Sequence, residues 1–227
     1  MRILDQLAAG RGERTQTANV AAAARCIAEP ILLEEIAAGL GGADRTAADC
    51  AEVLTKVAES RPELVAPLAP SLLACLHHRN GRVRWEAAHA VALVAGLVPA
   101  LVRAHVPLLA ELLRTHAGVI VRDYVIDALL AWAATDDDAC ATALPLLAEA
   151  LSLWEGRHVP RILGGLAAVA AARPHHAERI AALAVPFVDD GRASTRRAAR
   201  ALAGRHGRQA AKAQKPAKKA AARRTRA

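Results

Sequence analysis

Apolar residues in the segment 107–130 recur with the spacing of α-helices. Four leucines in its first part stand at i, i+1, i+4 and i+5, on one face of a helix: Leu108, Leu109, Leu112 and Leu113. Gly118 comes next, and glycine commonly follows a helix end. A second apolar face is formed by Val121, Val125, Ile126, Leu129 and Leu130. The segment therefore predicts two helices joined by a turn, which is a helix hairpin.

The same frame recurs five times along the chain. Each copy has a proline, an apolar helical stretch, a glycine-containing turn, and an arginine followed by an Ala/Leu-rich helix. The prolines are Pro30, Pro70, Pro107, Pro145 and Pro186. The arginines are Arg45, Arg84, Arg122, Arg161 and Arg196, separated by 39, 38, 39 and 35 residues. So constant a register predicts a repeat protein, because one hairpin cannot cover its own apolar face and neighbouring hairpins must stack.

Helix boundaries can be assigned from the same residues. We interpret each proline as a helix start, where the missing backbone N–H is not needed. The run Asp136, Asp137 and Asp138 is a polar connection that also supplies an N-cap for the next helix. A short helix and an Ala-rich helix within 1–29 are expected to cap the stack.

The pattern resembles HEAT repeats. The matching residues are the turn Asn80-Gly81-Arg82-Val83-Arg84 with the alanines that follow it, and the looser turn Asp189-Asp190-Gly191 with Arg196. The resemblance covers roughly residues 17–205 and implies an all-α fold, an α-α superhelix of about five helix hairpins plus an N-terminal cap. In that family a turn Asp and the Arg form a hydrogen-bonded ladder between repeats. Here the acidic turn position is irregular, and the turns near Gly118 and Gly156 lack it.

Composition agrees with a helical protein. Hydrophobic residues make up 54% of the chain but aromatic residues only 2%, and the apolar content is mainly Ala and Leu, which favour helices. Four widely spaced cysteines read as reduced, buried thiols: Cys26, Cys50, Cys75 and Cys140. Because neither a secretory signal nor a transmembrane segment is evident, a cytoplasmic protein without a membrane partner is expected.

Positive charge is concentrated at the C-terminal end. Of the 30 Lys and Arg residues, 13 fall in 191–227, which has no acidic residue; 17 basic and 22 acidic residues remain in 1–190, a net charge of −5. This division predicts a repeat domain at 1–206 and a disordered Lys/Arg/Ala-rich tail at 207–227. The tail resembles those of linker-histone-like bacterial proteins, which implies phosphate binding without base recognition.

The nucleic-acid-binding candidates lie in the last predicted helix and in this tail. They are Arg192, Arg196, Arg197, Arg200, Lys212, Lys215, Lys218, Lys219, Arg223, Arg224 and Arg226. The alternative interpretation of the tail is a solubilising terminus. The repeated arginines Arg45, Arg84, Arg122 and Arg161 are interpreted as structural residues that bond between repeats, rather than as a basic stripe.

Residues for catalysis and metal binding are weakly represented. Glu86 and His89 have the i, i+3 spacing of a carboxylate-bridged metal helix, but no second Glu-x-x-His follows, so we expect no metal and no cofactor. HEAT-like DNA glycosylases hold a catalytic Asp among aromatic residues, a role that Asp123 or Asp127 would take here beside Tyr124. Phosphate loops and nucleophile elbows are absent from the sequence.

The sequence thus favours a non-catalytic scaffold or adaptor over an enzyme. A protein partner is expected on a concave face lined by the second helices, and the basic tail would tether the protein to nucleic acid or another polyanion. The alternatives are a purely protein-binding scaffold with a solubilising tail and a HEAT-like DNA glycosylase.

Overall fold

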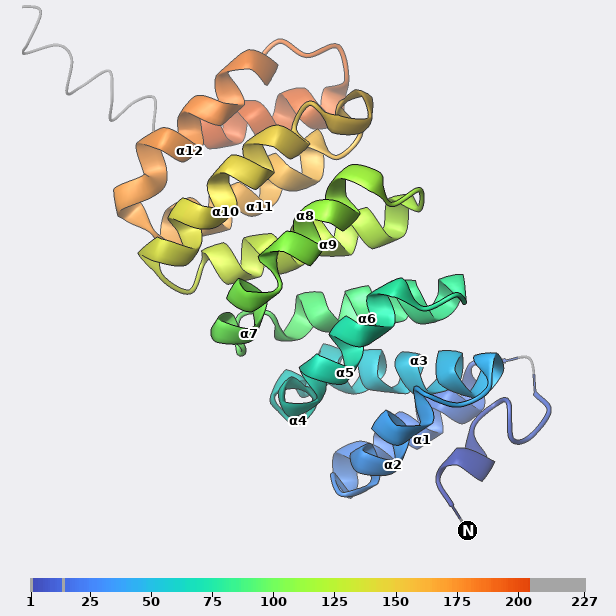
Figure 1. The fold of residues 1–227 in the computed structure, drawn as a ribbon. Helices are drawn as coiled ribbons and strands as arrows, with labels where there is room; N and C mark the ends of the chain where they lie inside the picture. The colour runs from blue at the N-terminus through green and yellow to red at the C-terminus, as the bar shows by residue number, and fades with distance from the viewer. Residues whose placement is uncertain (1, 14, 205–227) are drawn as a thin grey trace, which may run out of the picture. The chain divides into compact units, whose positions relative to one another are not determined.

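The computed structural model describes residues 2–13 and 15–204, and in these residues all regular structure is helical. The expected fold class, all-α with hairpins stacked in series, is confirmed (Figure 1). The α-helices are α1 (Thr17–Ala28), α2 (Leu32–Gly39), α3 (Asp44–Ser60), α4 (Pro62–Val65), α5 (Ala69–Ala74), α6 (Gly81–Val94), α7 (Pro99–Ala104), α8 (Val106–Thr115), α9 (Val119–Ala133), α10 (Asp137–Ala150), α11 (Val159–Ala172) and α12 (Ala177–Ala184). Residues 193–204 form a last described helix.

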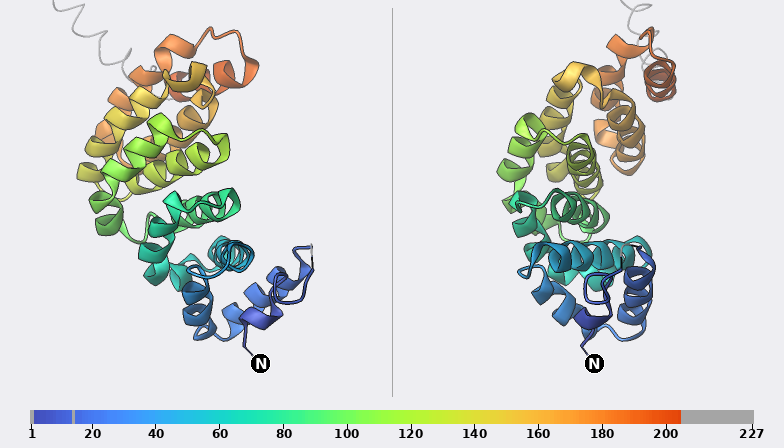
Figure 2. Two further views of the ribbon diagram at one scale, coloured as in Figure 1. Left: turned by 45° about the vertical axis from the view of Figure 1, so that its right-hand side comes forward. Right: turned by 90° about the vertical axis from the view of Figure 1, so that its right-hand side faces the viewer.

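The chain divides into two compact units, Met1–Trp132 and Ala133–Ala227. In the first unit α1 and α2 pack on α3, α3 packs on α6, and α5 packs on α6. In the second unit α11 packs on both α10 and α12. Within each unit, elements that are neighbours along the chain are therefore neighbours in space (Figure 2).

The repeated prolines do not all begin a helix. Pro70 and Pro107 stand near the starts of α5 and α8, as the sequence predicted. Pro145 instead lies inside α10, and the predicted start there is wrong. The helix begins earlier because the Asp136 side chain accepts the backbone N–H of Ala139 at 2.7 Å, which confirms the predicted cap.

An additional short helical segment precedes the repeated proline in the later repeats. These segments begin at other prolines, Pro62 in α4, Pro99 in α7 and Pro174 in a 3₁₀ turn. The first helical arm of a repeat is thus longer than the sequence analysis assumed. It is interrupted between α4 and α5 and between α7 and α8, whereas it runs continuously through α10.

The second helices carry much of the core. In α3, 11 of the 17 residues are buried, since α1, α2 and α6 all contact it. Charged side chains form a stripe along one edge of this helix, at successive helical turns: Arg45, Asp49, Glu52, Lys56 and Glu59. Asp49 and Glu52 are buried, whereas the other three side chains reach solvent at least in part. This stripe is where α3 can contribute to a binding site.

The turn between α10 and α11 has a left-handed backbone. Trp154, Glu155 and Gly156 have φ values of 53°, 56° and 66°. Non-glycine residues rarely adopt this conformation, so other contacts must hold it in place. One such contact is the Arg192 guanidinium, which donates to the Gly156 carbonyl at 2.9 Å and links this turn to the next one.

None of the helices among the described residues has both the length and the apolar character that crossing a membrane requires.

Candidate functional site

The repeat arginines are built into the turns between helices. Arg84 Nη1 donates to the carbonyls of His78 and Arg79, at 2.6 and 3.0 Å. Arg122 donates to the carbonyl of His116, again six residues before it. Arg196 does the same to Asp190, at 2.6 Å. The arginine in each of these repeats therefore fixes the turn that precedes its own helix.

The residue that accepts from this arginine also caps the turn with its side chain. His78 Nδ1 accepts the N–H of Asn80 at 3.0 Å, and His116 Nδ1 accepts the N–H of Gly118 at 2.9 Å. Asp190 accepts the N–H of Arg192 at 2.8 Å. Sequence analysis did not predict this role for the histidines. The signal that identifies it is the constant six-residue separation from the arginine.

Two other predicted repeat arginines stand elsewhere. Arg45 is the second residue of α3, whereas Arg84 is the fourth of α6, and Arg45 donates to the Glu13 carbonyl at 3.2 Å. Arg161 is the third residue of α11 and is exposed. A bond between successive repeats comes instead from Arg79, whose guanidinium lies 2.9 Å from the Asp44 carboxylate.

Most arginines of the predicted basic face have local partners. Arg192 lies before the last described helix and bonds Asp190, while Arg200 bonds the Val188 carbonyl and Asp189. Arg197 is exposed, and no ion pair joins it to another residue in the part of the chain described. The seven predicted tail residues lie outside the described residues: Lys212, Lys215, Lys218, Lys219, Arg223, Arg224 and Arg226.

A buried polar network occupies one end of the α3 stripe. Asn19 donates to Asp49 at 3.0 Å and to Glu52 at 2.7 Å, and it accepts the Ala8 N–H at 3.0 Å. Arg82 bonds both carboxylates. The two acids are almost fully buried, so these donors offset a large desolvation cost. The network ties the N-terminal segment to α1, α3 and α6, and it supplies donors to both carboxylates.

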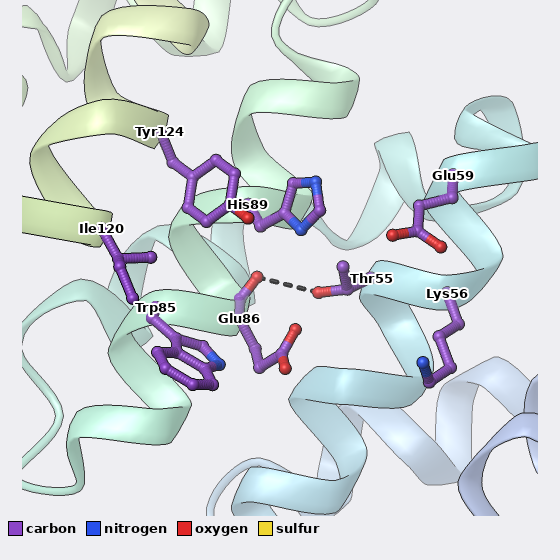
Figure 3. Close-up of a pocket in the computed structure, with 8 residues that line it drawn as sticks. All are labelled: Thr55, Lys56, Glu59, Trp85, Glu86, His89, Ile120 and Tyr124. Carbon is purple, nitrogen blue, oxygen red and sulfur yellow. Dashed lines mark hydrogen bonds between the residues drawn. The ribbon is translucent and has the colours of Figure 1, made fainter. Parts of the chain in front are cut away.

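The other end of the stripe opens into a pocket of about 210 Å³. Its lining comes from α3, α6 and α9, the second helices of three consecutive repeats (Figure 3). The lining residues are Thr55, Lys56, Glu59, Trp85, Glu86, His89, Ile120 and Tyr124. All of them belong to the first compact unit. Sequence analysis singled out Glu86 and His89 for their metal-like spacing and Tyr124 for a glycosylase role, without bringing the three together.

The pocket has a rigid floor and an aromatic wall. Thr55 is buried, and its hydroxyl donates to the carbonyls of Ala51 and Glu86 at 3.1 and 2.9 Å, which fastens α3 to α6 (Figure 3). The rings of His89 and Tyr124 stack with centroids 4.1 Å apart and 9° between their planes. This stack joins α6 to α9, so the wall is formed before any ligand arrives.

The apolar rim of the pocket is accessible. Trp85 is 38% exposed and Ile120 is 44% exposed, although both are large hydrophobic residues. Exposed apolar side chains that line one hollow together are a common feature of interaction sites. Lys56 also lines the pocket, on the side opposite these two residues (Figure 3), and its amine is paired with Glu52 at 3.4 Å.

Of the residues considered for a DNA glycosylase role, Tyr124 lines the pocket. Trp132 is fully buried, with the Arg103 guanidinium 5.7 Å from its ring centroid. Asp123 and Asp127 are not among the residues that line the pocket. Across the described residues, no three His, Cys, Asp or Glu side chains gather in a metal-binding arrangement, Glu86 and His89 included.

In the described residues the four cysteines are buried, as the sequence predicted, and none of them forms a disulfide. Burial raises the pKa of Cys26 to about 11 and that of Cys50 to about 12. Burial also raises the pKa values of Cys75 and Cys140. Such thiols are poor nucleophiles, because the thiolate is the reactive form.

Comparison with known proteins identifies the fold but no family. No family model matches the chain, and no curated protein does. Three engineered proteins solved by the Northeast Structural Genomics Consortium are similar in structure. They are 20%, 17% and 21% identical, with TM-scores of 0.61, 0.63 and 0.63. The matches cover 88%, 82% and 89% of this chain and 85%, 50% and 97% of the engineered chains. At this sequence identity the structural similarity establishes the fold alone. The protein is helical, and its structural neighbours are engineered helical-repeat proteins.

Proposed function

We propose that the protein is a non-catalytic binding scaffold whose second-helix face in residues 1–132 takes an extended segment of another protein. The observation that carries this proposal is the pocket on α3, α6 and α9 with the exposed Trp85 and Ile120 at its rim. Solenoid proteins expose the same helix of each repeat along one surface, so a partner can contact several repeats at once. Aromatic residues that are held rigidly are the usual anchors of such interfaces.

Selection from a library of displayed random peptides tests this proposal. Full-length protein should enrich peptides whose binding is lost in a Trp85→Ala, Ile120→Ala double variant. The matched control is Val20→Ala, Ile31→Ala, which removes two exposed apolar side chains from the same unit but away from the pocket. If the enriched peptides bind the double variant and the control equally well, the second-helix face is not the binding site.

The basic C-terminal segment supports a second activity, tethering to nucleic acid or another polyanion. The supporting observation is its charge, with no acidic residue after Asp190. Because most arginines of the last described helix already have partners, the seven tail residues are the main candidates. The competing proposal is that the tail only improves solubility.

A salt series distinguishes these two roles of the tail. Binding of fluorescent duplex DNA is compared between the full chain and a variant in which the seven candidate Lys and Arg residues of the tail are replaced by Gln. Each phosphate contact contributes about −0.9 to the slope of log K against log salt. Tethering predicts a slope approaching about −6 for seven contacts, lost in the variant. Equal, weak binding by both forms would leave only the solubilising role.

We further infer that the repeats are HEAT-like and that the protein works in a reducing, cytoplasmic environment. The turn built around Arg84 and its equivalents supports the first inference. Four buried thiols support the second, because oxidising compartments favour disulfides.

A further inference from the structure

Two carboxylates in the pocket differ from the other acids of the second-helix face. Asp49 and Glu52 form ion pairs with Arg82, Glu52 also pairs with Lys56, and both accept hydrogen bonds from Asn19. Glu59 and Glu86 also line the pocket, yet no cation within 4.0 Å pairs with either one in the described part of the chain. The pocket therefore presents negative charge that the protein itself does not neutralise.

Aromatic groups lie on one side of these two carboxylates. Figure 3 shows the Glu86 carboxylate between the Trp85 indole and the Lys56 side chain, with His89, Tyr124 and Glu59 above it. Aromatic faces attract cations through the ring quadrupole, and tryptophan does so most strongly. Carboxylates and an indole facing one small hollow are thus complementary to a cation that also has a flat surface.

We propose, resting on the function proposed above, that this pocket binds an arginine side chain of the partner's extended segment. A planar guanidinium can bond a carboxylate through two parallel N–H groups while stacking on an aromatic ring, which an ammonium cannot do as well. A phosphate or a nucleic-acid backbone is disfavoured, because Glu59 and Glu86 would repel it. The net charge of −5 in residues 1–190 steers a cationic partner toward the body of the protein.

The shape of the site favours a side chain over a free cation. The Thr55 hydroxyl holds α3 against α6, and the His89–Tyr124 stack holds α6 against α9. The hollow is thereby formed in advance, so little ordering is needed when the ligand enters. Ile120 at the rim can pack against the aliphatic stem of the arginine, while flanking residues of the peptide follow the surface of the second helices.

Two small probes test the proposal on the full-length protein. N-acetyl-arginine N-methylamide is compared with N-acetyl-citrulline N-methylamide, which has nearly the same shape but no charge. The readout is the indole N–H resonance of Trp85 in ¹H–¹⁵N spectra, assigned with Trp85→Phe. The arginine probe should shift this resonance saturably with a dissociation constant in the millimolar range, as expected for a small ligand. The citrulline probe should bind at least about 10-fold more weakly.

Charge-neutral variants locate the effect. Glu59→Gln with Glu86→Gln should weaken the arginine probe by about 10-fold or more, because its charge-assisted hydrogen bonds are lost. Glu34→Gln with Glu111→Gln is the matched control, since it removes two exposed carboxylates of α2 and α8 and should leave binding unchanged. Circular dichroism spectra confirm that each variant is folded.

Three outcomes overturn the inference: equal binding of the two probes, an unchanged affinity in the Glu59, Glu86 variant, or no shift of the Trp85 resonance. Enriched peptides that need Trp85 but contain no arginine also overturn it, while leaving the proposed scaffold function intact. Specific binding of the arginine probe without any peptide enrichment supports the pocket's specificity and counts against the scaffold function.

Discussion

Replacing Arg84 by Met should destabilise the first compact unit far more than replacing its neighbour Arg79 by Met. Methionine keeps much of the apolar stem of Arg84 but removes the guanidinium that bonds the His78 and Arg79 carbonyls. Hydrogen bonds to a charged group are worth about 1.5–3 kcal/mol each, and the two share one donor atom. We therefore expect a loss of about 2–3 kcal/mol in the free energy of unfolding.

Arg79 is the matched control because it lies in the same turn and also bonds another segment. Its guanidinium lies 2.9 Å from Asp44, but the two side chains are 80% and 41% exposed. An ion pair so open to solvent contributes about 0–1 kcal/mol. Arg84→Lys should recover part of the loss, since an ammonium restores one bond but not the geometry of the guanidinium.

The assay is urea unfolding followed by circular dichroism, together with hydrogen exchange of the amides in residues 80–84. Exchange is needed because a chain with two compact units need not unfold in one step. The Arg84→Met variant should show faster exchange in this turn as well as a lower midpoint. If the two Met variants lose equal stability, or if Arg84→Met loses less than about 0.5 kcal/mol, the arginine does not fix the turn.

Three further predictions concern pH, backbone conformation and thiol reactivity. Burial lowers the pKa of His116, so the folded protein favours the neutral ring, which accepts the Gly118 N–H. The resulting stability is fully present above the unfolded pKa of about 6.5, and it is lost as the pH falls through the lower pKa of the folded state. Urea unfolding at several pH values should show a smaller loss on acidification in His116→Asn, whose amide oxygen accepts without titrating; equal losses would contradict this. Gly156→Ala should lower the free energy of unfolding by about 1–2 kcal/mol and reduce the melting temperature, because φ at this position is +66°. Gly164→Ala should instead raise the free energy of unfolding by about 0.5–1 kcal/mol, because it lies inside α11 and the added Cβ would meet open space. Cys50, whose pKa burial raises to about 12, should react with iodoacetamide only after denaturant opens the fold, and rapid native-state labelling identified by mass spectrometry would refute its burial.

Local sequence patterns were sufficient to predict the helical character of the chain and one helix boundary, the start of α10. Apolar spacing in 107–130 reflects contacts between residues a few positions apart, so it survives without any knowledge of the tertiary structure. The Asp136 cap was predictable for the same reason, because its bond spans only three residues. The position of Pro145 inside a helix was not predictable, since proline is compatible with a helix start as well as with a bent helix interior. In α10 the Asp136 cap and the buried residues before the proline extend the helix through it.

The sequence by itself determined an all-helical chain of hairpins repeating every 35 to 39 residues, because helix periodicity and turns are local properties. It did not reveal that His78, His116 and Asp190 play one role, since two different side chains perform it and only the hydrogen bonds show the equivalence. Tertiary structure alone decided the pocket. Its residues lie on helices that are about one repeat apart in sequence, and stacking brings them together. Stacking also decides which carboxylates form an ion pair with a neighbouring helix and which, like Glu59 and Glu86, form none among the described residues, because an ion pair depends on distance in space rather than along the chain.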